Sequence, residues 1–166
     1  MAEIVTTYLQ MGALKELVPA RSSDPDFIVR EAVERQWQLN RSLYRLVGEQ
    51  WAWIDRQRWS DQQWGSYVAS DQLRTFVASW RGATAGYYEL QRDDAQAVEI
   101  AYFGLAPAFI GRGFGGALLT DALKQAWAWE AHRVWVHTCT LDHPAALNNY
   151  QARGMQVYDR KSHQAA

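Results

Sequence analysis

The stretch of sequence that decides the fold covers residues 98–119 and reads VEIAYFGLAPAFIGRGFGGALL. It predicts a strand, a turn marked by Pro107, a glycine-rich loop and the first turns of a helix. The loop holds four glycines around Arg112 and Phe114, namely Gly111, Gly113, Gly115 and Gly116. Glycines let the backbone approach a ligand closely, and the free N–H groups at the start of the helix would point at the same spot. The stretch therefore predicts a binding turn for phosphate groups.

The segments on either side of this stretch predict a mixed sheet. Strands are expected over 27–33, 73–80, 85–91, 98–105, 133–139 and 155–160. Helices are expected over 35–47, 60–68, 114–130 and 143–154. Ser60 followed by Gln63 is a capping box for the second helix, and a tight turn at 81–84 makes a hairpin of its flanking strands. The order of elements predicts an α/β (α+β) fold whose central sheet is mostly antiparallel, with helices on both faces.

The first residues fall outside this pattern. Residues 4–9 are compatible with a short strand, and an irregular polar segment then ends at Pro25. We therefore interpret residues 1–25 as an N-terminal extension and residues 26–166 as the domain. A length of 166 residues agrees with a single domain.

Composition excludes several classes of function. The formal net charge of −1 gives no bulk attraction to nucleic acid or to an anionic membrane, so neither partner is expected. The N-terminal sequence has neither a basic start nor a long apolar core, so we expect no signal peptide, no membrane span and a cytoplasmic location. Cys139 is the only cysteine. A metal site made of Cys139, His137 and His143 would lack a fourth ligand, so no metal is expected. No third group is seen that would orient a Cys–His pair for hydrolysis.

The spacing of the glycines and of the leucine pair at 118–119 resembles the central motif of GNAT-type acetyltransferases. This family transfers an acetyl group from acetyl-CoA to an amine, and its motif is Q/R-x-x-G-x-G/A followed by two leucines. Counted back from the leucines, the motif glycines fall on Gly113 and Gly115, and Ile110 stands where the family has Gln or Arg. If the motif is instead aligned to start at Arg112, its Q/R and glycine positions match the family pattern, but the leucines come two residues too early. Because backbone donors hold the ligand in such a turn, Ile110 need not abolish binding, and Arg112 can supply charge.

A second motif of the same family lies near the end of the chain. The family has an asparagine, an alanine three residues on, a tyrosine four after that, and then a glycine followed by an aromatic residue. These positions correspond to His143, Ala146, Tyr150, Gly154 and Met155. His143 and Met155 depart from the pattern, and the other three match it.

The resemblance implies that acetyl-CoA binds along the glycine loop and at the end of the strand before it. The residues that it assigns to acetyl-CoA are Phe103, Gly104, Leu105, Ile110, Gly111, Arg112, Gly113, Phe114, Gly115, Gly116, His143 and Tyr150. Backbone N–H groups at 103–105 would hold the thioester oxygen and the pantetheine arm. Tyr150 matches the position that gives a proton to the leaving thiolate in many relatives.

Transfer of an acetyl group to an amine also calls for a base. An alkyl amine with a pKa of ~10.4 is almost wholly protonated at pH 7, and only the neutral amine is a nucleophile. Glu99 is the first candidate, because it lies on the strand that leads into the glycine loop and matches a catalytic glutamate of some family members. Glu89 on the neighbouring strand is the second candidate, and either could act through a water.

Tryptophan is unusually frequent, with nine in the chain. Trp51, Trp53, Trp59 and Trp64 follow the first predicted helix, in a region that by resemblance shapes the acceptor pocket. Core packing accounts for any single tryptophan, whereas the cluster as a whole predicts an aromatic wall for an apolar or cationic acceptor. The predicted substrate-binding residues are Tyr44, Trp53, Trp59 and Glu89.

The function implied by the resemblance is transfer of an acetyl group to a primary amine of a small molecule in a ternary complex. Two alternatives stay open. A protein acetyltransferase acting on lysines or amino termini would need an open groove, which bulky aromatic residues do not favour. A catalytically silent acyl-CoA-binding module is supported by the departures at Ile110 and His143. The resemblance also allows a homodimer, because exposed strand edges in such folds often pair.

Overall fold

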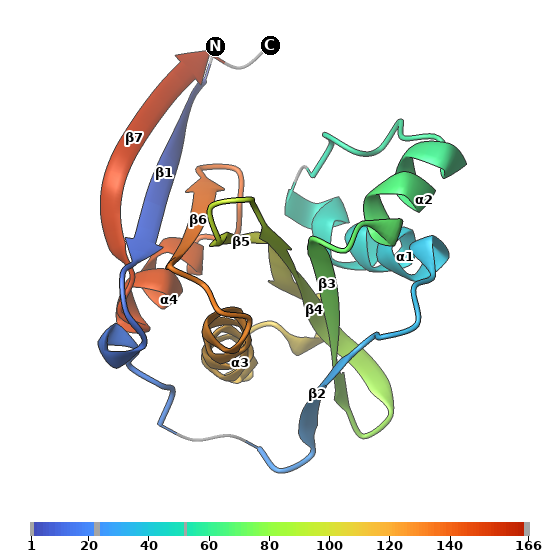
Figure 1. Ribbon diagram of the computed structural model, residues 1–166, viewed down its shortest axis with the longest axis horizontal. Coiled ribbons are helices and arrows are strands. Elements are labelled where there is room, and N and C mark those ends of the chain that lie inside the picture. The colour runs from blue at the N-terminus through green and yellow to red at the C-terminus, as the bar shows by residue number, and fades with distance from the viewer. Residues whose placement is uncertain (1, 22–23, 52, 165–166) are drawn as a thin grey trace.

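The computed structural model describes residues 2–21, 24–51 and 53–164, and the strands of this part form one mixed sheet (Figure 1). In chain order the strands are β1 (Glu3–Met11), β2 (Phe27–Glu31), β3 (Leu73–Trp80), β4 (Ala83–Arg92), β5 (Ala97–Leu105), β6 (Arg133–Cys139) and β7 (Gln156–Gln164). They lie in the order β2-β3-β4-β5-β6-β1-β7. Neighbouring strands are antiparallel except β5 and β6, which are parallel. The predicted mixed, mostly antiparallel sheet is confirmed.

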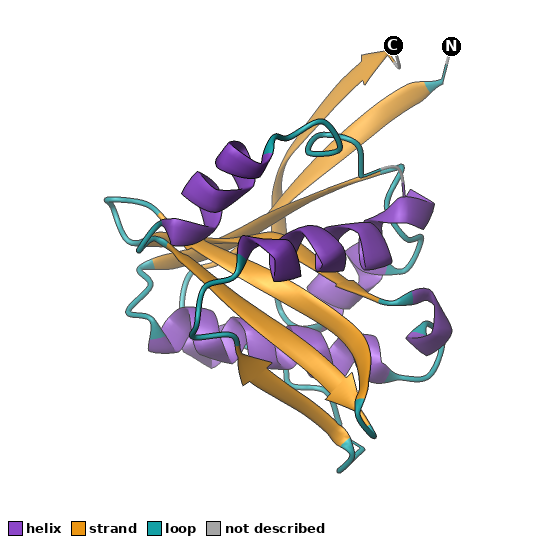
Figure 2. Cartoon of the chain, turned by 90° about the vertical axis from the view of Figure 1, so that its right-hand side faces the viewer, coloured by secondary structure: helices purple, strands orange, loops and turns teal. Residues whose placement is uncertain are grey.

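Helices cover both faces of the sheet (Figure 2). On one face α1 (Trp37–Gly48) and α2 (Asp61–Ala69) pack against β3, β4 and β5, and on the other α3 (Phe114–Ala128) and α4 (Ala146–Ala152) pack together. The described part of the chain also has 3-10 turns between other elements: η1 (Leu14–Glu16) between β1 and β2, η2 (Glu49–Trp51) between α1 and α2, and η3 (Pro107–Phe109) between β5 and α3. Within the described part of the chain, none of the helices is long and apolar enough to cross a membrane.

Local sequence signals account for several element boundaries. The predicted capping box is confirmed, because Gln63 N–H donates to Ser60 Oγ at 3.1 Å and Ser60 N–H donates to Gln63 Oε1 at 2.8 Å. The predicted hairpin of β3 and β4 is also confirmed. Its turn residues Arg81 and Gly82 have φ values of 48° and 83°, the positive values that a two-residue turn of this twist requires.

Within the predicted N-terminal extension, residues 3–11 belong to the sheet. Strand β1 lies between β6 and β7 and pairs with both of them in antiparallel fashion. Its alternating residues Thr7, Leu9 and Met11 are buried in the sheet, which is the reason that this segment belongs to the fold. The last helix is shorter than the predicted 143–154, because α4 begins at Ala146. The residues before it form a turn in which Ala145 N–H donates to Nδ1 of His143 at 2.9 Å.

The main core lies between the sheet and α3. Its buried residues include Leu118, Leu119, Ala122 and Leu123, which come at helical spacing on the inner side of α3. A second, smaller cluster under α1 consists of Leu43, Val47 and Tyr87, with Leu39, Trp53, Val77 and Tyr102 packed against it. The two clusters hold β4 and β5 from both sides, so these central strands provide a rigid base for a site.

Strand β5 carries a bulge in its middle. Tyr102 pairs with Glu89 and Ile100 pairs with Leu90, which leaves Ala101 without a partner on β4. Because side chains alternate along a strand, the extra residue brings Glu99 and Tyr102 to the same face, the one covered by α1 and α2. The sequence pattern did not predict this bulge, and it determines which side chains of β5 can meet.

Candidate active site

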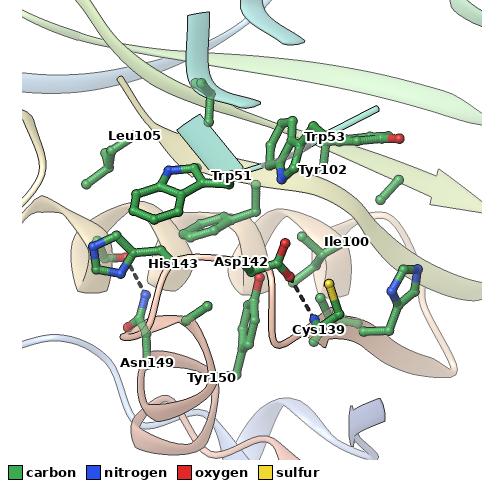
Figure 3. A pocket seen from close by; sticks show the side chains of 18 of the residues that line it. Trp51, Trp53, Ile100, Tyr102, Leu105, Cys139, Asp142, His143, Asn149 and Tyr150 are labelled. Carbon is green, nitrogen blue, oxygen red and sulfur yellow. Dashed lines mark hydrogen bonds between the residues drawn. The ribbon is translucent and has the colours of Figure 1, made fainter. Parts of the chain in front are cut away.

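A cavity opens where β5 and β6 part (Figure 3). The parallel ladder joins Ala97 to Arg133, Val98 to Val134 and Glu99 to Trp135, and it extends no further along either strand. The cavity occupies the gap beyond this point and has a volume of about 870 Å³. Its size falls within the range of about 300–1,000 Å³ that small-molecule sites span.

The glycine loop forms one end of this cavity. Gly111 and Gly113 have φ values of 79° and 85°, which residues with a side chain rarely adopt. Gly113 is the N-cap of the 15-residue helix α3, so the unpaired N–H groups of the first helical turn lie next to the loop. Gly111, Gly115 and Gly116 line the cavity. The loop thus presents backbone donors and the positive end of a helix dipole, an arrangement suited to phosphate groups.

Two side chains near the loop, those of Asn149 and Arg112, differ from what the sequence predicted. Asn149 of α4 lines the cavity and its Nδ2 donates to the carbonyl oxygen of Gly115 at 3.0 Å, which fixes α4 against the loop (Figure 3). Arg112 is turned away from the cavity, and its guanidinium carbon lies 4.5 Å from the ring centre of Trp80. The loop therefore offers backbone donors to the cavity rather than the charge of Arg112.

Glu99 lies at the last pair of the parallel ladder and lines the cavity. Its Oε2 lies 3.6 Å from Nε2 of His137 on β6, and the two side chains are 20% and 50% exposed. Burial raises the pKa of Glu99 above its usual value, although the charges of His137 and Arg56 act against this. A carboxyl group with a raised pKa that faces a cavity can act as a general base near neutral pH.

Glu89, the second candidate base, does not line the cavity and is only 1% exposed. It accepts hydrogen bonds from Asn40 Nδ2 at 2.8 Å and from the Tyr67 hydroxyl, and its Oε1 lies 3.5 Å from Nη1 of Arg56. Burial raises the pKa of Glu89, while Arg56, Tyr67 and Asn40 favour its charged form. Its partners come from α1, α2 and the segment between them, so Glu89 joins these parts to β4.

Tyr150 lines the cavity from α4 and is 5% exposed. Burial first, and then the charge of Asp142, raises the pKa of the Tyr150 phenol, which therefore stays protonated. Asp142 lies beside it in Figure 3 and accepts a hydrogen bond from Cys139 N–H at 2.9 Å. The arrangement places an un-ionised hydroxyl in the wall of the cavity, where it can donate a proton.

The aromatic residues divide into two groups. Trp51 and Trp53 line the cavity, and the ring centre of Trp51 lies 4.9 Å from that of His143, which also lines it (Figure 3). Trp59 and Tyr44 do not line it. Trp59 instead packs against other aromatic side chains, and Tyr44 is buried and donates its hydroxyl hydrogen to Asp55 at 3.0 Å.

The predicted site residues are thus only partly brought together. Those that line the cavity are Trp53, Glu99, Phe103, Gly104, Leu105, Ile110, Gly111, Gly115, Gly116, His143 and Tyr150. Those that do not are Tyr44, Glu89, Trp59, Arg112, Gly113 and Phe114. Sequence reasoning missed Arg56 and Asn149, and it considered His137 only as a metal ligand. In the part of the chain that the structure describes, no group of three or more His, Cys, Asp and Glu could hold a metal ion.

Comparison with known families and proteins gives consistent results. A model described as the acetyltransferase (GNAT) family matches residues 33–155. Two curated relatives, uncharacterized N-acetyltransferases of Mycobacterium bovis and Mycobacterium tuberculosis, are each 31% identical over 77 residues, or 46% of this chain and 49% of theirs. The match therefore spans about half the length of these relatives.

Solved structures resemble this chain over a larger share of its length than the curated relatives do. A GCN5-related N-acetyltransferase from Sphaerobacter thermophilus superposes with a TM-score of 0.71 at 17% identity, over 95% of this chain and 49% of that one. An aminoglycoside acetyltransferase from an uncultured soil metagenomic sample, solved with trehalose, gives a TM-score of 0.65 at 15% identity, over 78% and 88%. At these identities the likeness concerns the fold alone.

Proposed function

The chain belongs to the acetyltransferase (GNAT) family, and on this premise we propose that it transfers an acetyl group from acetyl-CoA to a primary amine of a small molecule by direct attack in a ternary complex. One observation carries the proposal. A single cavity connects the glycine loop at Gly111, the carboxyl group of Glu99 and the hydroxyl group of Tyr150. A phosphate-binding end, a base and a proton donor are the parts that such a transfer requires.

The chemistry of the cavity fits acetyl-CoA as the acetyl donor. The pyrophosphate would be held by backbone N–H groups of the glycine loop and of the first turn of α3. The pantetheine arm would lie along 103–105, where β5 has parted from β6 and lines the cavity. Acetyl-CoA would supply the acetyl group as a reactive thioester.

The chain's own residues would manage the protons and the developing charge. Glu99 would take a proton from the ammonium group, directly or through a water, so that the neutral amine can attack the thioester carbonyl carbon. As the new C–N bond forms and the C–S bond breaks, the Tyr150 hydroxyl would protonate the departing sulfur, and the second proton that the nitrogen loses would restore the Tyr150 hydroxyl by way of water. Backbone N–H groups at 103–105 would stabilise the negative charge that develops on the carbonyl oxygen.

The form of the cavity supports a small acceptor rather than a polypeptide. Trp51 and His143, which come from two distant segments, both line the cavity and contact each other there. An extended peptide needs a groove that is open at both ends, and this contact does not favour one. We therefore place a protein acetyltransferase second.

The proposal is tested by incubating the protein with acetyl-CoA and a panel of small amines, amino sugars and amino acids while free thiol is measured. We expect thiol release that depends on an amine. Glu99→Gln should abolish turnover and retain binding of acetyl-CoA in calorimetry. Binding of acetyl-CoA without turnover of any amine would favour the silent acyl-CoA-binding module, and no binding at all would overturn the proposal.

A further inference from the structure

Among the described residues that line the cavity, Arg56 is the only arginine or lysine. Its side chain is only 11% exposed, yet it lines the cavity. Glu99 lines the same cavity, and the charge of Arg56 lowers the pKa of Glu99. A buried guanidinium group at this place is expensive unless it has a use or a partner.

The partner that the protein supplies is Glu89, and it satisfies Arg56 only in part. Nη1 of Arg56 lies 3.5 Å from Oε1 of Glu89, which is an ion pair but longer than a good hydrogen bond. Nη1 is buried, and no residue in the described ranges accepts a hydrogen bond from it. Since Nη1 is buried, the cavity meets Arg56 through its other atoms.

Aromatic rings enclose the same guanidinium group. Its central carbon lies 3.9 Å from the ring centre of Tyr67, 4.2 Å from that of Tyr102 and 4.4 Å from that of Trp59. These are distances of cation–π contacts, so the aromatic wall already holds a cation, and this cation is Arg56 itself. One face of each of these three rings is therefore taken by Arg56, and Trp59, which does not line the cavity, contacts this guanidinium group.

The acidic groups nearby are occupied as well. Asp55 accepts hydrogen bonds from the hydroxyl groups of Tyr44 and Tyr102. Burial raises the pKa of Tyr44 to about 12, so its hydroxyl remains a donor. Glu99 faces His137. Arg56 is a cation in this part of the cavity whose hydrogen-bonding capacity the described residues do not fully use, and a planar guanidinium group matches a carboxylate best.

We propose that the acceptor is an amine that also carries a carboxylate group, and that Arg56 binds this carboxylate while the amine faces Glu99. The inference rests on the proposed acetyl transfer and specifies its substrate class. The occupied aromatic cage holds the guanidinium plane in place, so little freedom is lost when the carboxylate binds. Glu89 keeps the guanidinium charged and oriented from the side away from the cavity.

The test compares acceptors that differ only in the carboxylate. β-Alanine, γ-aminobutyrate and longer ω-amino acids are each measured against their carboxamides, with acetyl-CoA and thiol detection. In these pairs the amine is remote from the altered group, so its basicity changes little. We expect the acid to have a kcat/KM at least about tenfold above that of its amide for the best chain length, since a charged hydrogen bond is lost in the amide.

Variants assign the preference to Arg56. Glu89→Gln serves as the background, so that removal of Arg56 does not leave a buried carboxylate unpaired. In Arg56→Gln combined with Glu89→Gln, the ratio of acid to amide should fall to about one. Arg56→Lys keeps a charge but loses the planar fork, so it should retain part of the preference and supports the assignment if the double variant fails to fold. Arg58→Gln, an exposed change in the same segment, should leave the ratio unchanged.

Binding separates this inference from the proposed function. Quenching of tryptophan fluorescence by the same acids and amides reports on the site without turnover, because Trp59 lies next to Arg56. Acids that bind in preference to amides but are never acetylated would overturn the proposed function and support the Arg56 site. Acetylation of acids and amides at equal rates, or a preference that survives loss of Arg56, would overturn the Arg56 site and leave the function intact.

Discussion

Glu99 and His137 face each other at the point where β5 and β6 part, with Oε2 and Nε2 3.6 Å apart. The contact joins two strands whose ladder ends at Glu99, so it lies at the entrance to the gap between them. His137 is the more exposed of the two side chains. When it is protonated, His137 therefore places a positive charge beside the carboxyl group of Glu99.

His137→Gln should move the acid limb of the kcat/KM profile to higher pH. Glu99 must be ionised to act as a base, and burial already raises its pKa, while the charges of His137 and Arg56 lower it. When the charge of His137 is removed, less opposes the effect of burial, so the pKa of Glu99 rises further. A higher pH is then needed to ionise Glu99. The profile is measured from initial rates at saturating acetyl-CoA. Glu99→Gln should abolish turnover, and any residual activity should lack this limb; a limb that persists in the residual activity would shift attention to Glu89.

Tyr150→Phe should lower kcat by about 10²-fold or more, as expected for loss of a positioned proton donor. Burial raises the pKa of Tyr150, so the hydroxyl is un-ionised at neutral pH, and phenylalanine keeps the ring while it removes the proton. Binding of acetyl-CoA, measured by calorimetry, should change little. Tyr158→Phe on the exposed strand β7 is the matched control. Equal losses of kcat in both variants, or unchanged kcat in Tyr150→Phe, would show that Tyr150 does not supply the proton.

Local signals predicted the parts of the fold that depend on neighbouring residues. The capping box at Ser60, the hairpin turn at Arg81 and the glycine loop are each set by a few consecutive residues, and all three are present in the structure. The position of β1 could not be predicted in this way. Its place between β6 and β7 depends on pairing with segments more than a hundred residues away. The sequence of a strand does not by itself determine which strands it pairs with.

The candidate site shows the same division. Tyr150 could be predicted because it belongs to a motif of fixed spacing, and Glu99 because it lies on the strand that leads into the glycine loop and matches a catalytic glutamate of some family members; both line the cavity. Arg56 could not, because its environment is built from Glu89 on β4, Tyr67 on α2 and Tyr102 on β5, which converge only in the folded chain. The bulge at Ala101 is equally hidden, since a bulge is defined by the pairing of two strands.

Glu89→Gln should destabilise the protein by about 3–5 kcal/mol, because it leaves Arg56 buried without its counter-charge. Arg56→Gln should cost a similar amount for the converse reason. The double variant should be less destabilised than the sum of the two, which shows that the pair acts as a unit. Urea denaturation of the four proteins gives the coupling free energy. Glu31→Gln, which breaks the more exposed pair with Arg74, should cost about 1 kcal/mol or less. Additive losses would mean that Arg56 and Glu89 are held independently.

Gly113→Ala should weaken binding of acetyl-CoA by more than its effect on folding accounts for. Gly113 has a φ of 85°, and Gly82 in the β3–β4 turn has a φ of 83°, so alanine meets the same backbone strain at both positions. A Cβ atom at either position would also meet no other atom within 4 Å, which removes packing as a difference. Each change should therefore cost roughly 1 kcal/mol of stability.

Only Gly113 precedes the first turn of α3, where the N–H groups that would hold the pyrophosphate are directed. Calorimetric titration with acetyl-CoA should show at least about tenfold weaker binding for Gly113→Ala and unchanged binding for Gly82→Ala. Because the two variants carry the same backbone strain, a difference between them reports on the loop itself. Equal affinities in both variants would mean that the conformation of this loop does not hold the phosphate groups, and the assignment of the cavity to acetyl-CoA would fail with it.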